Sequence, residues 1–407
     1  MCNIKDVLKS FRKYLAKKIF DKKDKSGKTF DVNKVKSVLF FRNDDKIGDV
    51  VVSTLLFREI KKQYSDIEII VLCGKNNREI IKYNNNVEQI YEVGKSIFKD
   101  ILIFLKLRKQ NVSLAVDFYP FRPRFKHLLM LRIIAPKFLV GFYKSLYNIY
   151  DFSIDVNFFD IHISKRYEYL LKILKIENPD LKYDIVLSSK EEIKVLKLIE
   201  NLSTPSASNE EDKIIVMKNS REGDTSATEL PKHDKQQNFA KNTIKKYSVK
   251  YKIVLNPFAA SKHRSFEYYK LKELINIIED KIDCCVFMLC QKKNKQEIKS
   301  LENNRTFAVC FESVLESAAL IRHADLVISP DTSIVHIAAA FNKKIVALYL
   351  NYSNTYEKID IIWGPNNPNS IQLSVNTKNS TLENDIKNIP NVDILNALQK
   401  LLKGSSK

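Results

Sequence analysis

The chain has 407 residues, which exceeds one ordinary domain, and its 68 Lys and Arg against 48 Asp and Glu give a formal net charge of +20. This charge alone does not indicate a nucleic-acid-binding protein, because the sequence has no zinc-finger spacing, no basic region with heptads and no aromatic RNA-binding signature. No apolar run approaches the roughly 20 residues of a membrane span.

The first 28 residues hold ten Lys or Arg against three Asp. Their apolar residues fall on one helical stripe, and Lys interrupts that stripe too often for a signal peptide: Ile4, Val7, Leu8, Phe11, Leu15 and Ile19. A basic amphipathic helix of this kind is typical of a membrane-surface element. The alternative is a helix packed on the domain that follows.

The next segment has the pattern of a β-turn-α unit. Residues 38–42 form a short apolar run of strand type, a polar turn follows, and residues 49–64 have helical spacing before a second strand at 67–72. Gly48 permits a tight turn. Asp49 is either the helix N-cap, which composition favours, or a carboxylate aimed into a cleft. One oxygen could cap the helix while the other points to a substrate.

Further strands are expected at 114–117 and 138–142, and a helix at 168–176. A basic cluster with interleaved aromatic residues follows the first of these strands and comprises Arg122, Arg124, Lys126 and Arg132. Such a cluster could bind phosphate or carboxylate groups. A hinge is expected near 178–189, and the polar, apolar-poor segment 202–249 is expected to be a solvated insertion.

The second half again alternates strands and helices. Strands are expected at 252–255, 284–289, 325–328 and 345–350, and helices at 268–281 and 313–323. Repeated β-α units of this kind specify parallel, doubly wound sheets.

Two strand-to-helix turns in this half have the residues of a phosphate site. Ser261 and the alanines before it permit close approach of a ligand, and Lys262 and Arg264 can neutralise phosphate. In the other turn, Pro330 is expected to stop the strand, and Asp331, Thr332 and Ser333 can cap the next helix. His336 adds an imidazole there. The simpler alternative is an ordinary N-cap with a packed core histidine.

Four segments resemble glycosyltransferase family 9, the bacterial heptosyltransferases. They are Arg42-Asn-Asp-Asp-Lys-Ile-Gly-Asp-Val-Val-Val, the His-x-x-x-Arg-Tyr segment beginning at His162, the loop after Asn256-Pro257 that contains Lys262, and Asp331-Thr-x-x-x-His-Ile-Ala-Ala-Ala. The resemblance implies a GT-B architecture of the α/β class, with two Rossmann-like doubly wound domains facing a central cleft. On this basis residues 1–34 form a basic amphipathic arm, 35–177 the acceptor domain, 178–250 a hinge plus polar insertion, and 251–407 the nucleotide-sugar donor domain.

The resemblance also implies roles for individual residues. Asp49 corresponds to the general base of the family, and Lys262 to the residue that stabilises the leaving nucleotide, with Arg264 as its rival. The expected donor-binding residues are Ser261, Arg264, Asp331, Thr332, Ser333 and His336, with Ser333 in place of the family's Gly. The expected acceptor-binding residues are Gly48, Arg122 and Arg124. The loop 291–296 lacks the usual Gly-rich form, so base and ribose contacts stay unassigned.

The reaction implied is inverting transfer of a heptose from ADP-heptose to the inner core of lipopolysaccharide, without metal or other cofactor, because no Asp-x-Asp motif is present. The partners implied are the nucleotide-sugar donor, an anionic glycolipid acceptor and the cytoplasmic surface of the inner membrane, but no nucleic acid. Another nucleotide sugar or acceptor, or a catalytically inactive GT-B-like binding protein, remains an alternative. Six scattered cysteines without a Cys-x-x-Cys pair indicate reduced thiols, and hence a cytoplasmic protein. Together with the basic amphipathic stripe, this predicts a protein peripherally bound to the inner membrane.

Overall fold

The computed structural model describes residues 30–94, 96–119, 123, 125–156, 160–203, 249–351, 358–376 and 385–404. The chain divides into two compact units, unit 1 (Met1–Val186) and unit 2 (Leu187–Lys407). The basic arm at 1–28, Arg122, Arg124 and nearly all of the expected insertion lie outside the described residues.

Unit 1 is built on a parallel sheet of six strands in the order β3-β2-β1-β4-β5-β6. The strands are β1 (Ser37–Arg42), β2 (Glu68–Cys73), β3 (Gln89–Glu92), β4 (Leu114–Asp117), β5 (Phe138–Phe142) and β6 (Phe152–Ile154). The helices are α2 (Ile47–Gln63), α3 (Ile97–Gln110), α4 (Phe125–Ile134) and α5 (Ile163–Ile173), with short 3-10 turns η1 (Val32–Lys34) and η2 (Glu79–Ile81).

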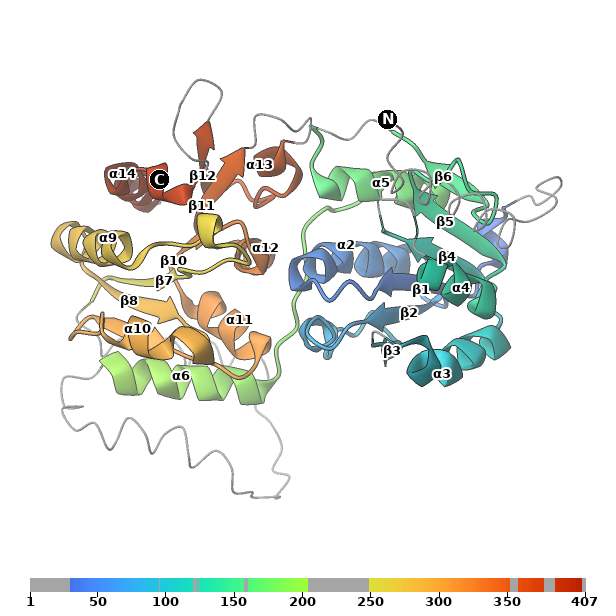
Figure 1. Ribbon diagram of the computed structural model, residues 1–407, viewed down its shortest axis with the longest axis horizontal. Helices are drawn as coiled ribbons and strands as arrows, with labels where there is room; N and C mark the ends of the chain where they lie inside the picture. The colour runs from blue at the N-terminus through green and yellow to red at the C-terminus, as the bar shows by residue number, and fades with distance from the viewer. Residues whose placement is uncertain are drawn as a thin grey trace, which may run out of the picture. The chain divides into compact units, whose positions relative to one another are not determined.

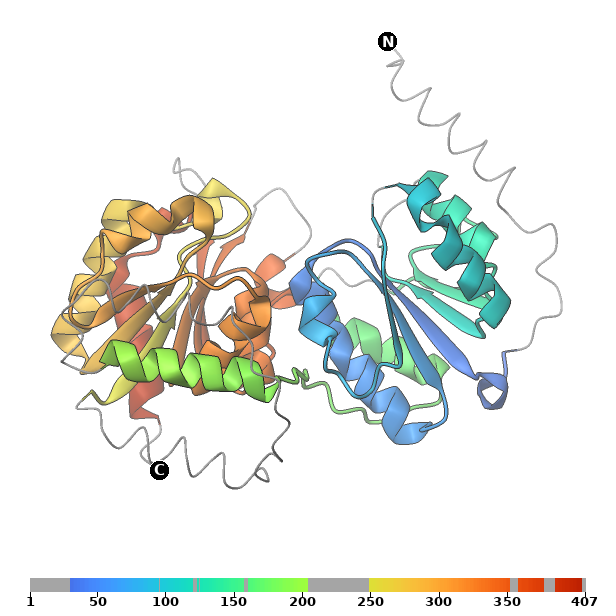
Figure 2. The same ribbon diagram turned by 90° about the horizontal axis from the view of Figure 1, so that it is seen from below.

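Helices cover both faces of this sheet, which is why its central strands are apolar on both sides. All six residues of β1 are buried. Figure 2 shows α3 and α4 on one face, and α2 and α5 on the other. The helix α5 begins five residues earlier than the sequence predicted, because the His162 side chain accepts a hydrogen bond from Ser164 N and caps its first turn.

Unit 2 repeats the design with a second six-stranded parallel sheet in the order β12-β11-β10-β7-β8-β9. The strands are β7 (Tyr251–Leu255), β8 (Cys284–Leu289), β9 (Thr306–Val309), β10 (Leu326–Pro330), β11 (Lys344–Asn351) and β12 (Ser370–Asn376). The helices are α6 (Ser189–Ser203), α9 (Tyr268–Lys281), α10 (Lys295–Lys299), α11 (Val314–His323), α12 (Ser333–Ala340), α13 (Ile359–Ile362) and α14 (Asn391–Lys403), with 3-10 turns η4 (Lys262–Arg264), η5 (Lys292–Asn294) and η6 (Ile386–Asn388).

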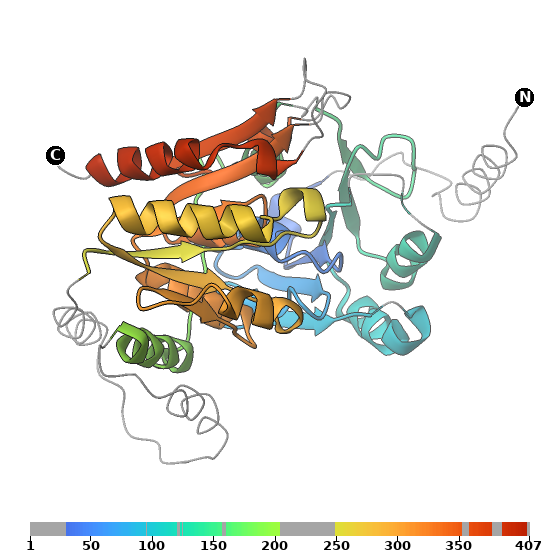
Figure 3. The same ribbon diagram turned by 60° about the vertical axis from the view of Figure 1, so that its left-hand side comes forward.

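In unit 2, α9 and α14 lie side by side over one face of the sheet and enclose its main apolar core (Figure 3). Residues 189–203, which the sequence placed in the hinge and insertion segment, form α6, which packs against α11 through ion pairs of Lys194 with Glu316 (2.6 Å) and Arg322 with Glu192 (2.9 Å). The strand β10 includes Pro330 as its last residue instead of ending before it.

Both sheets have the strand order of a Rossmann fold, since counting strands within each unit gives 3-2-1-4-5-6 (Figure 1). The prediction of two doubly wound α/β sheets is therefore confirmed. In such a sheet the order in which strands are added reverses between the first and fourth strands. Ligands bind beyond the carboxyl ends of the strands at that switch point. The two switch points lie between β1 and β4 in unit 1 and between β7 and β10 in unit 2.

Candidate active site

The start of α2 places Asp49 beyond the carboxyl end of β1. The helix begins at Ile47, its N-cap is Lys46, and Asp49 lies in its first turn, so the N-cap role that composition favoured for Asp49 is wrong. The expected tight turn at Gly48 is also wrong, because Gly48 is the second residue of α2 and the turn residue with positive φ is Asp45, at 63°. The side chain of Asp49 is thus left available for another purpose, at a helix N-terminus that favours negative charge.

Asp45 and Asn77 hold this turn against the end of β2. Both oxygens of the Asp45 carboxylate accept hydrogen bonds from Asn76, each at 2.6 Å. The buried Asn77 amide donates to the Arg42 carbonyl at 2.7 Å and accepts from Gly74 N at 2.8 Å. The turn that carries Asp49 is therefore fixed by side-chain bonds to the neighbouring strand.

A buried arginine lies beneath Asp49. The Arg42 guanidinium donates from Nε to Ser53 Oγ at 2.7 Å and also hydrogen-bonds the hydroxyl of Tyr167. Its Cζ lies 3.6 Å from the ring centroid of Phe118, which is a cation–π contact. Ser53 in turn donates to the Asp49 backbone carbonyl at 2.8 Å. Through this chain Arg42 fixes the first turn of α2 as well as contributing positive charge near the carboxylate.

Asp49 is 7% exposed, and burial raises the pKa of its carboxyl group to about 6. The positive charge of Arg42 opposes this rise in pKa, whereas the negative charge of Asp44 adds to it. The nearest ion partner is the mostly exposed Lys46, with 3.8 Å between Nζ and the carboxylate. Asp49 is therefore ionised at neutral pH yet basic enough to take a proton, as a general base requires.

A second buried carboxylate, Asp117, ends β4 on the other side of the switch point. Its oxygens contact His127 Nε2 at 2.9 Å, Tyr119 N at 2.9 Å and the Tyr150 hydroxyl. Burial alone would raise the pKa of Asp117, but His127, the buried Lys144 and the hydroxyl of Tyr150 lower it to about 2. The Lys144 ammonium donates to the Tyr119 carbonyl, and burial lowers its pKa. Asp117 is thus a permanent anion that orders the segment after β4.

Neither His127 nor Lys144 was predicted as a site residue from the sequence. His127 could have been recognised from its position in the first turn of the helix that follows β4. Polar groups just beyond the carboxyl end of a parallel strand lie close to those of the neighbouring strands. Of the four cationic residues expected to bind an acceptor, two are described: Lys126, which donates to the Gly94 carbonyl at 3.3 Å, and Arg132, which is exposed near the end of α4.

In unit 2 the loops after β7 and β10 are joined across the switch point by Asn256. Its Nδ2 donates to Ser329 Oγ at 2.9 Å and to Thr332 Oγ1 at 3.1 Å. Thr332 is the N-cap of α12, and its hydroxyl accepts from Ile334 N. The cap predicted for the Asp-Thr-Ser triplet is confirmed for Thr332, whereas Asp331 has a different role.

The Asp331 carboxylate forms an ion pair with Arg264, at 2.8 Å between Nη1 and Oδ2. Arg264 therefore connects the loop after β7 to the start of α12. In the same 3-10 turn, His263 pairs with Asp385 at 3.2 Å. Lys262, the third basic residue, is exposed and makes no ion pair within the described part of the chain. Within the described ranges, the ammonium of Lys262 is thus the one charge of this triplet without an ion-pair partner.

The loop 256–265 is itself compact. Ser265 Oγ accepts from Ala259 N at 3.0 Å and donates to the Ser261 carbonyl at 2.9 Å. The closed loop ends in the 3-10 turn η4, and α9 begins at Tyr268, as the sequence predicted. Ser261 is the N-cap position of η4 and is partly exposed, in keeping with a loop that a ligand can approach.

Within α12, Ser333 is the first helical residue and Gly is not required there, since Ser333 has no positive φ. His336 is buried and packs edge-on against Trp363, with 6.1 Å between ring centroids. Trp363 is the single tryptophan of the chain. Its indole therefore reports on changes at the α12 corner without interference from another tryptophan.

The described residues contain no group of three or more His, Cys, Asp or Glu side chains placed to hold a metal ion. None of the helices in the described ranges is both long and apolar enough to cross a membrane. The five described cysteines are free thiols, and four of them are buried.

Comparison with known proteins agrees with this geometry. Residues 210–389 match the model of "Glycosyltransferase family 9 (heptosyltransferase)". The chain is 23% identical over 374 residues to "Putative lipopolysaccharide heptosyltransferase 4" of Escherichia coli K12, covering 89% of this chain and 90% of that protein.

Two solved structures share the fold across both units. One is the ADP-heptose lps heptosyltransferase II of Escherichia coli, with a TM-score of 0.65, 15% identity and coverage of 91% of this chain and 100% of the other. The second is a family 9 glycosyl transferase from Veillonella parvula, with a TM-score of 0.67, 13% identity and coverage of 93% and 100%. The family match, the curated relative and the shared GT-B fold confirm the resemblance to glycosyltransferase family 9 that the sequence motifs carry.

Proposed function

We propose that this glycosyltransferase moves a heptose from ADP-heptose to the inner core of lipopolysaccharide, by an inverting reaction that uses no metal ion. The observation that carries the proposal is the buried Asp49 carboxylate, with its pKa raised to about 6, at the carboxyl end of β1. The names of the curated relative and of a solved structure, both lipopolysaccharide heptosyltransferases, support the choice of sugar and acceptor.

The chemistry assigned to unit 1 is deprotonation of the acceptor. An acceptor hydroxyl donates its proton to Asp49 while its oxygen bonds to the anomeric carbon of the heptose. The bond from that carbon to the diphosphate oxygen breaks at the same time, so the configuration inverts and ADP leaves with the bonding electron pair. Asp49 ends the step protonated and returns the proton to water.

The chemistry assigned to unit 2 is support of the leaving diphosphate. In the loop after β7, Lys262 supplies an exposed ammonium and Ser261 a hydroxyl. Thr332 and Ser333 supply hydroxyl and backbone donors at the N-terminus of α12, where the helix dipole favours negative charge. Arg264 and Asp331 bind the donor as a pair, with Asp331 fixing the guanidinium. His336 supports the same corner from within α12. These groups act in place of a divalent cation.

On the acceptor side we assign Gly48, Arg122 and Arg124. Gly48 has no side chain next to Asp49, which leaves space for a hydroxyl group. The two arginines suit an anionic glycolipid, because guanidinium groups bind phosphate in a bidentate manner. The same acceptor implies a protein that works in the cytoplasm at the inner-membrane surface, with no role for nucleic acid.

The test is the structure of lipopolysaccharide made without this enzyme. Mass spectrometry of the core from a deletion strain should show loss of one heptose and of everything attached beyond it. Purified protein should transfer heptose from ADP-heptose to that truncated core in the presence of a chelator. A core of unchanged mass, or a loss of a sugar other than heptose, would contradict the proposed reaction.

The choice of nucleotide can be tested separately. Intrinsic tryptophan fluorescence should respond to ADP more strongly than to UDP or GDP.

A further inference from the structure

Helix α3 of unit 1 presents large apolar side chains to solvent. Phe98 is 91% exposed, Leu102 is 75% exposed and Leu105 is 42% exposed. At about 100° per residue these positions fall within about 60° of one another around the helix axis. They form one outward stripe along most of α3, which we call the α3 face.

The fold does not require this stripe. The inward side of α3 is supplied by other residues, among them Phe104 and Leu107, which are buried in the core shared with α4 and the sheet. Large apolar side chains arranged in a row on an exposed helix are more typical of an interaction surface than of chance exposure.

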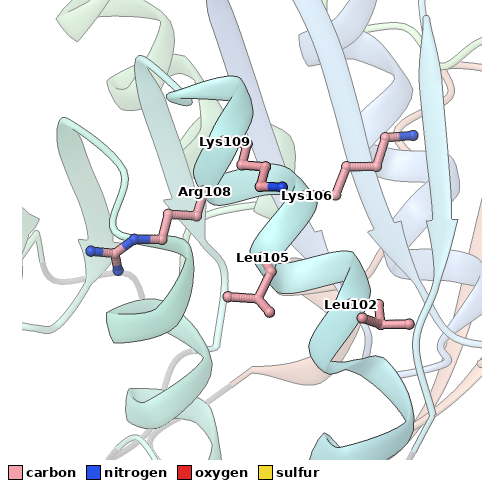
Figure 4. Close-up of a pocket in the computed structure, with 5 residues that line it drawn as sticks. All are labelled: Leu102, Leu105, Lys106, Arg108 and Lys109. Atoms are coloured by element: carbon pink, nitrogen blue, oxygen red, sulfur yellow. The ribbon is translucent and has the colours of Figure 1, made fainter.

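The exposed charged residues of α3 are all positive. Lys99 and Lys106 lie on one flank, Arg108 lies on the other, and Lys109 follows the stripe at its end. The one acidic residue of the helix, Asp100, is buried and accepts a hydrogen bond from Gly94 N at 2.9 Å. Figure 4 shows a hollow on this helix lined by Leu102, Leu105, Lys106, Arg108 and Lys109. Apolar residues flanked by cations match the interface of an anionic bilayer.

The α3 face also has a definite place relative to Asp49. Because α3 links the end of β3 to the start of β4 in a parallel sheet, its N-terminus lies at the carboxyl edge, where α2 also begins. The next helix, α4, runs alongside in the same direction, since Lys126 donates to the Gly94 carbonyl at its start and Arg108 to the Ile133 carbonyl at its end.

As a result, exposed Phe98 and the exposed Phe125 of α4 both lie at the sheet edge that carries Asp49. A bilayer on this surface would bring a membrane-anchored hydroxyl toward the base.

We propose that the α3 face docks unit 1 on an anionic lipid bilayer. The inference rests on the proposed function, which supplies the membrane-anchored acceptor. It assigns the membrane contact to α3, whereas the sequence predicted that contact for the basic arm at 1–28. Charge argues against two other occupants. That arm carries ten Lys or Arg against three Asp, and a second copy of the chain has the same basic surface and the same net charge of +20. Both would be repelled by the lysines that flank the stripe.

Co-sedimentation of the full chain with lipid vesicles tests this assignment. The variant Phe98→Ser/Leu102→Ser should bind vesicles of phosphatidylglycerol and phosphatidylcholine at least about tenfold more weakly than the unchanged protein. The matched control is Ile193→Ser/Val392→Ser, which removes two exposed apolar side chains from unit 2 and should bind as the unchanged protein does. Binding to phosphatidylcholine alone should be weak in all cases, and added salt should weaken the anionic binding.

Two further measurements keep the outcomes distinct. Light scattering without vesicles should give the same mass for the protein and its Phe98→Ser/Leu102→Ser variant; a dimer that this variant abolishes would overturn the proposal in favour of self-association. Equal vesicle binding by both proteins, with or without residues 1–28, would also overturn it.

Transfer to a lipid-free, water-soluble acceptor separates this inference from the sugar chemistry. The Phe98→Ser/Leu102→Ser variant should keep that activity and lose activity on the vesicle-bound acceptor. Vesicle binding that depends on the α3 face in a protein that transfers no sugar would refute the proposed reaction and leave the docking surface standing.

Discussion

The Arg264 guanidinium lies 2.8 Å from the Asp331 carboxylate, and this ion pair joins the loop after β7 to the loop after β10. The two loops flank the switch point of the unit 2 sheet, where a nucleotide is expected to bind. Each partner is only partly exposed, so removal of one leaves the other charge poorly solvated and the corner less well fixed.

Asp331→Ala should therefore weaken ADP binding by about tenfold, because Arg264 loses its fixed position and the N-terminus of α12 loses a tie to η4. Titration of the fluorescence of Trp363 with ADP measures this directly. The matched control is Asp325→Asn, which removes an ion pair with Lys252 at the opposite end of the same strand, where the two groups are 3.4 Å apart. Equal loss of affinity in both variants would show that the effect is general destabilisation.

Lys262→Ala should lower kcat by about 10- to 100-fold with a smaller effect on ADP affinity, because its charge is needed most when the diphosphate leaves. Lys272→Ala, which removes an exposed ammonium from α9 in the same unit, should leave kcat unchanged. If instead Arg264→Ala reduces kcat and Lys262→Ala does not, the leaving-group role belongs to Arg264.

The pH dependence of kcat/KM should show an acidic limb near pH 6, since Asp49 must be ionised to accept a proton and burial raises its pKa to about 6. Asp44→Asn removes a negative charge that contributes to this rise, so its acidic limb should move to lower pH. Asp393→Asn, an exposed carboxylate change in unit 2, should leave the profile in place. An acidic limb that does not respond to Asp44→Asn would argue against Asp49 as the titrating group.

Asp117→Asn should lower the free energy of unfolding by about 3–5 kcal/mol at neutral pH, because the buried Lys144 loses its nearby countercharge and His127 its partner. The pKa of Asp117 is held at about 2, below its usual range, so its contribution is present above pH 4 and is lost as the pH falls toward 2. Denaturant titrations should accordingly show the gap between the two proteins closing as the pH falls below about 4. Asp66→Asn, on an exposed turn, should cost little at any pH.

The central strands of both units and the helices α2, α9 and α11 could be predicted from the sequence because their apolar runs and helical periods are strong. Four of the longer helices were not predicted: α3, α4, α6 and α14. Strands β4, β5 and β8 and helix α9 have the expected bounds. The short edge strands β3, β6 and β9 were missed, since three or four residues give too little periodicity to separate them from a loop. The seven-residue edge strand β12 was missed as well. Helix boundaries that depend on a side-chain cap, such as His162 for α5, also differed.

The site was predictable to the level of the turns but not of the contacts within them. The sequence indicated that Asp49 and Asp331 begin helices, and composition favoured caps; the structure instead buries Asp49 above Arg42 and pairs Asp331 with Arg264. Both arrangements depend on residues from other strands. The Asp117–His127–Lys144 cluster, drawn from β4, α4 and the end of β5, is long-range for the same reason.

The most direct test of the account is a paired measurement on Asp49→Asn, a substitution that keeps the shape of the side chain and removes its capacity to take a proton. The rate of sugar transfer should fall by at least about 100-fold. The ADP dissociation constant read from Trp363 fluorescence should stay within about twofold of the unchanged protein, because the residues proposed to bind ADP all belong to unit 2. Transfer at the normal rate, or loss of ADP binding in parallel with the rate, would contradict the assignment of Asp49 as the base.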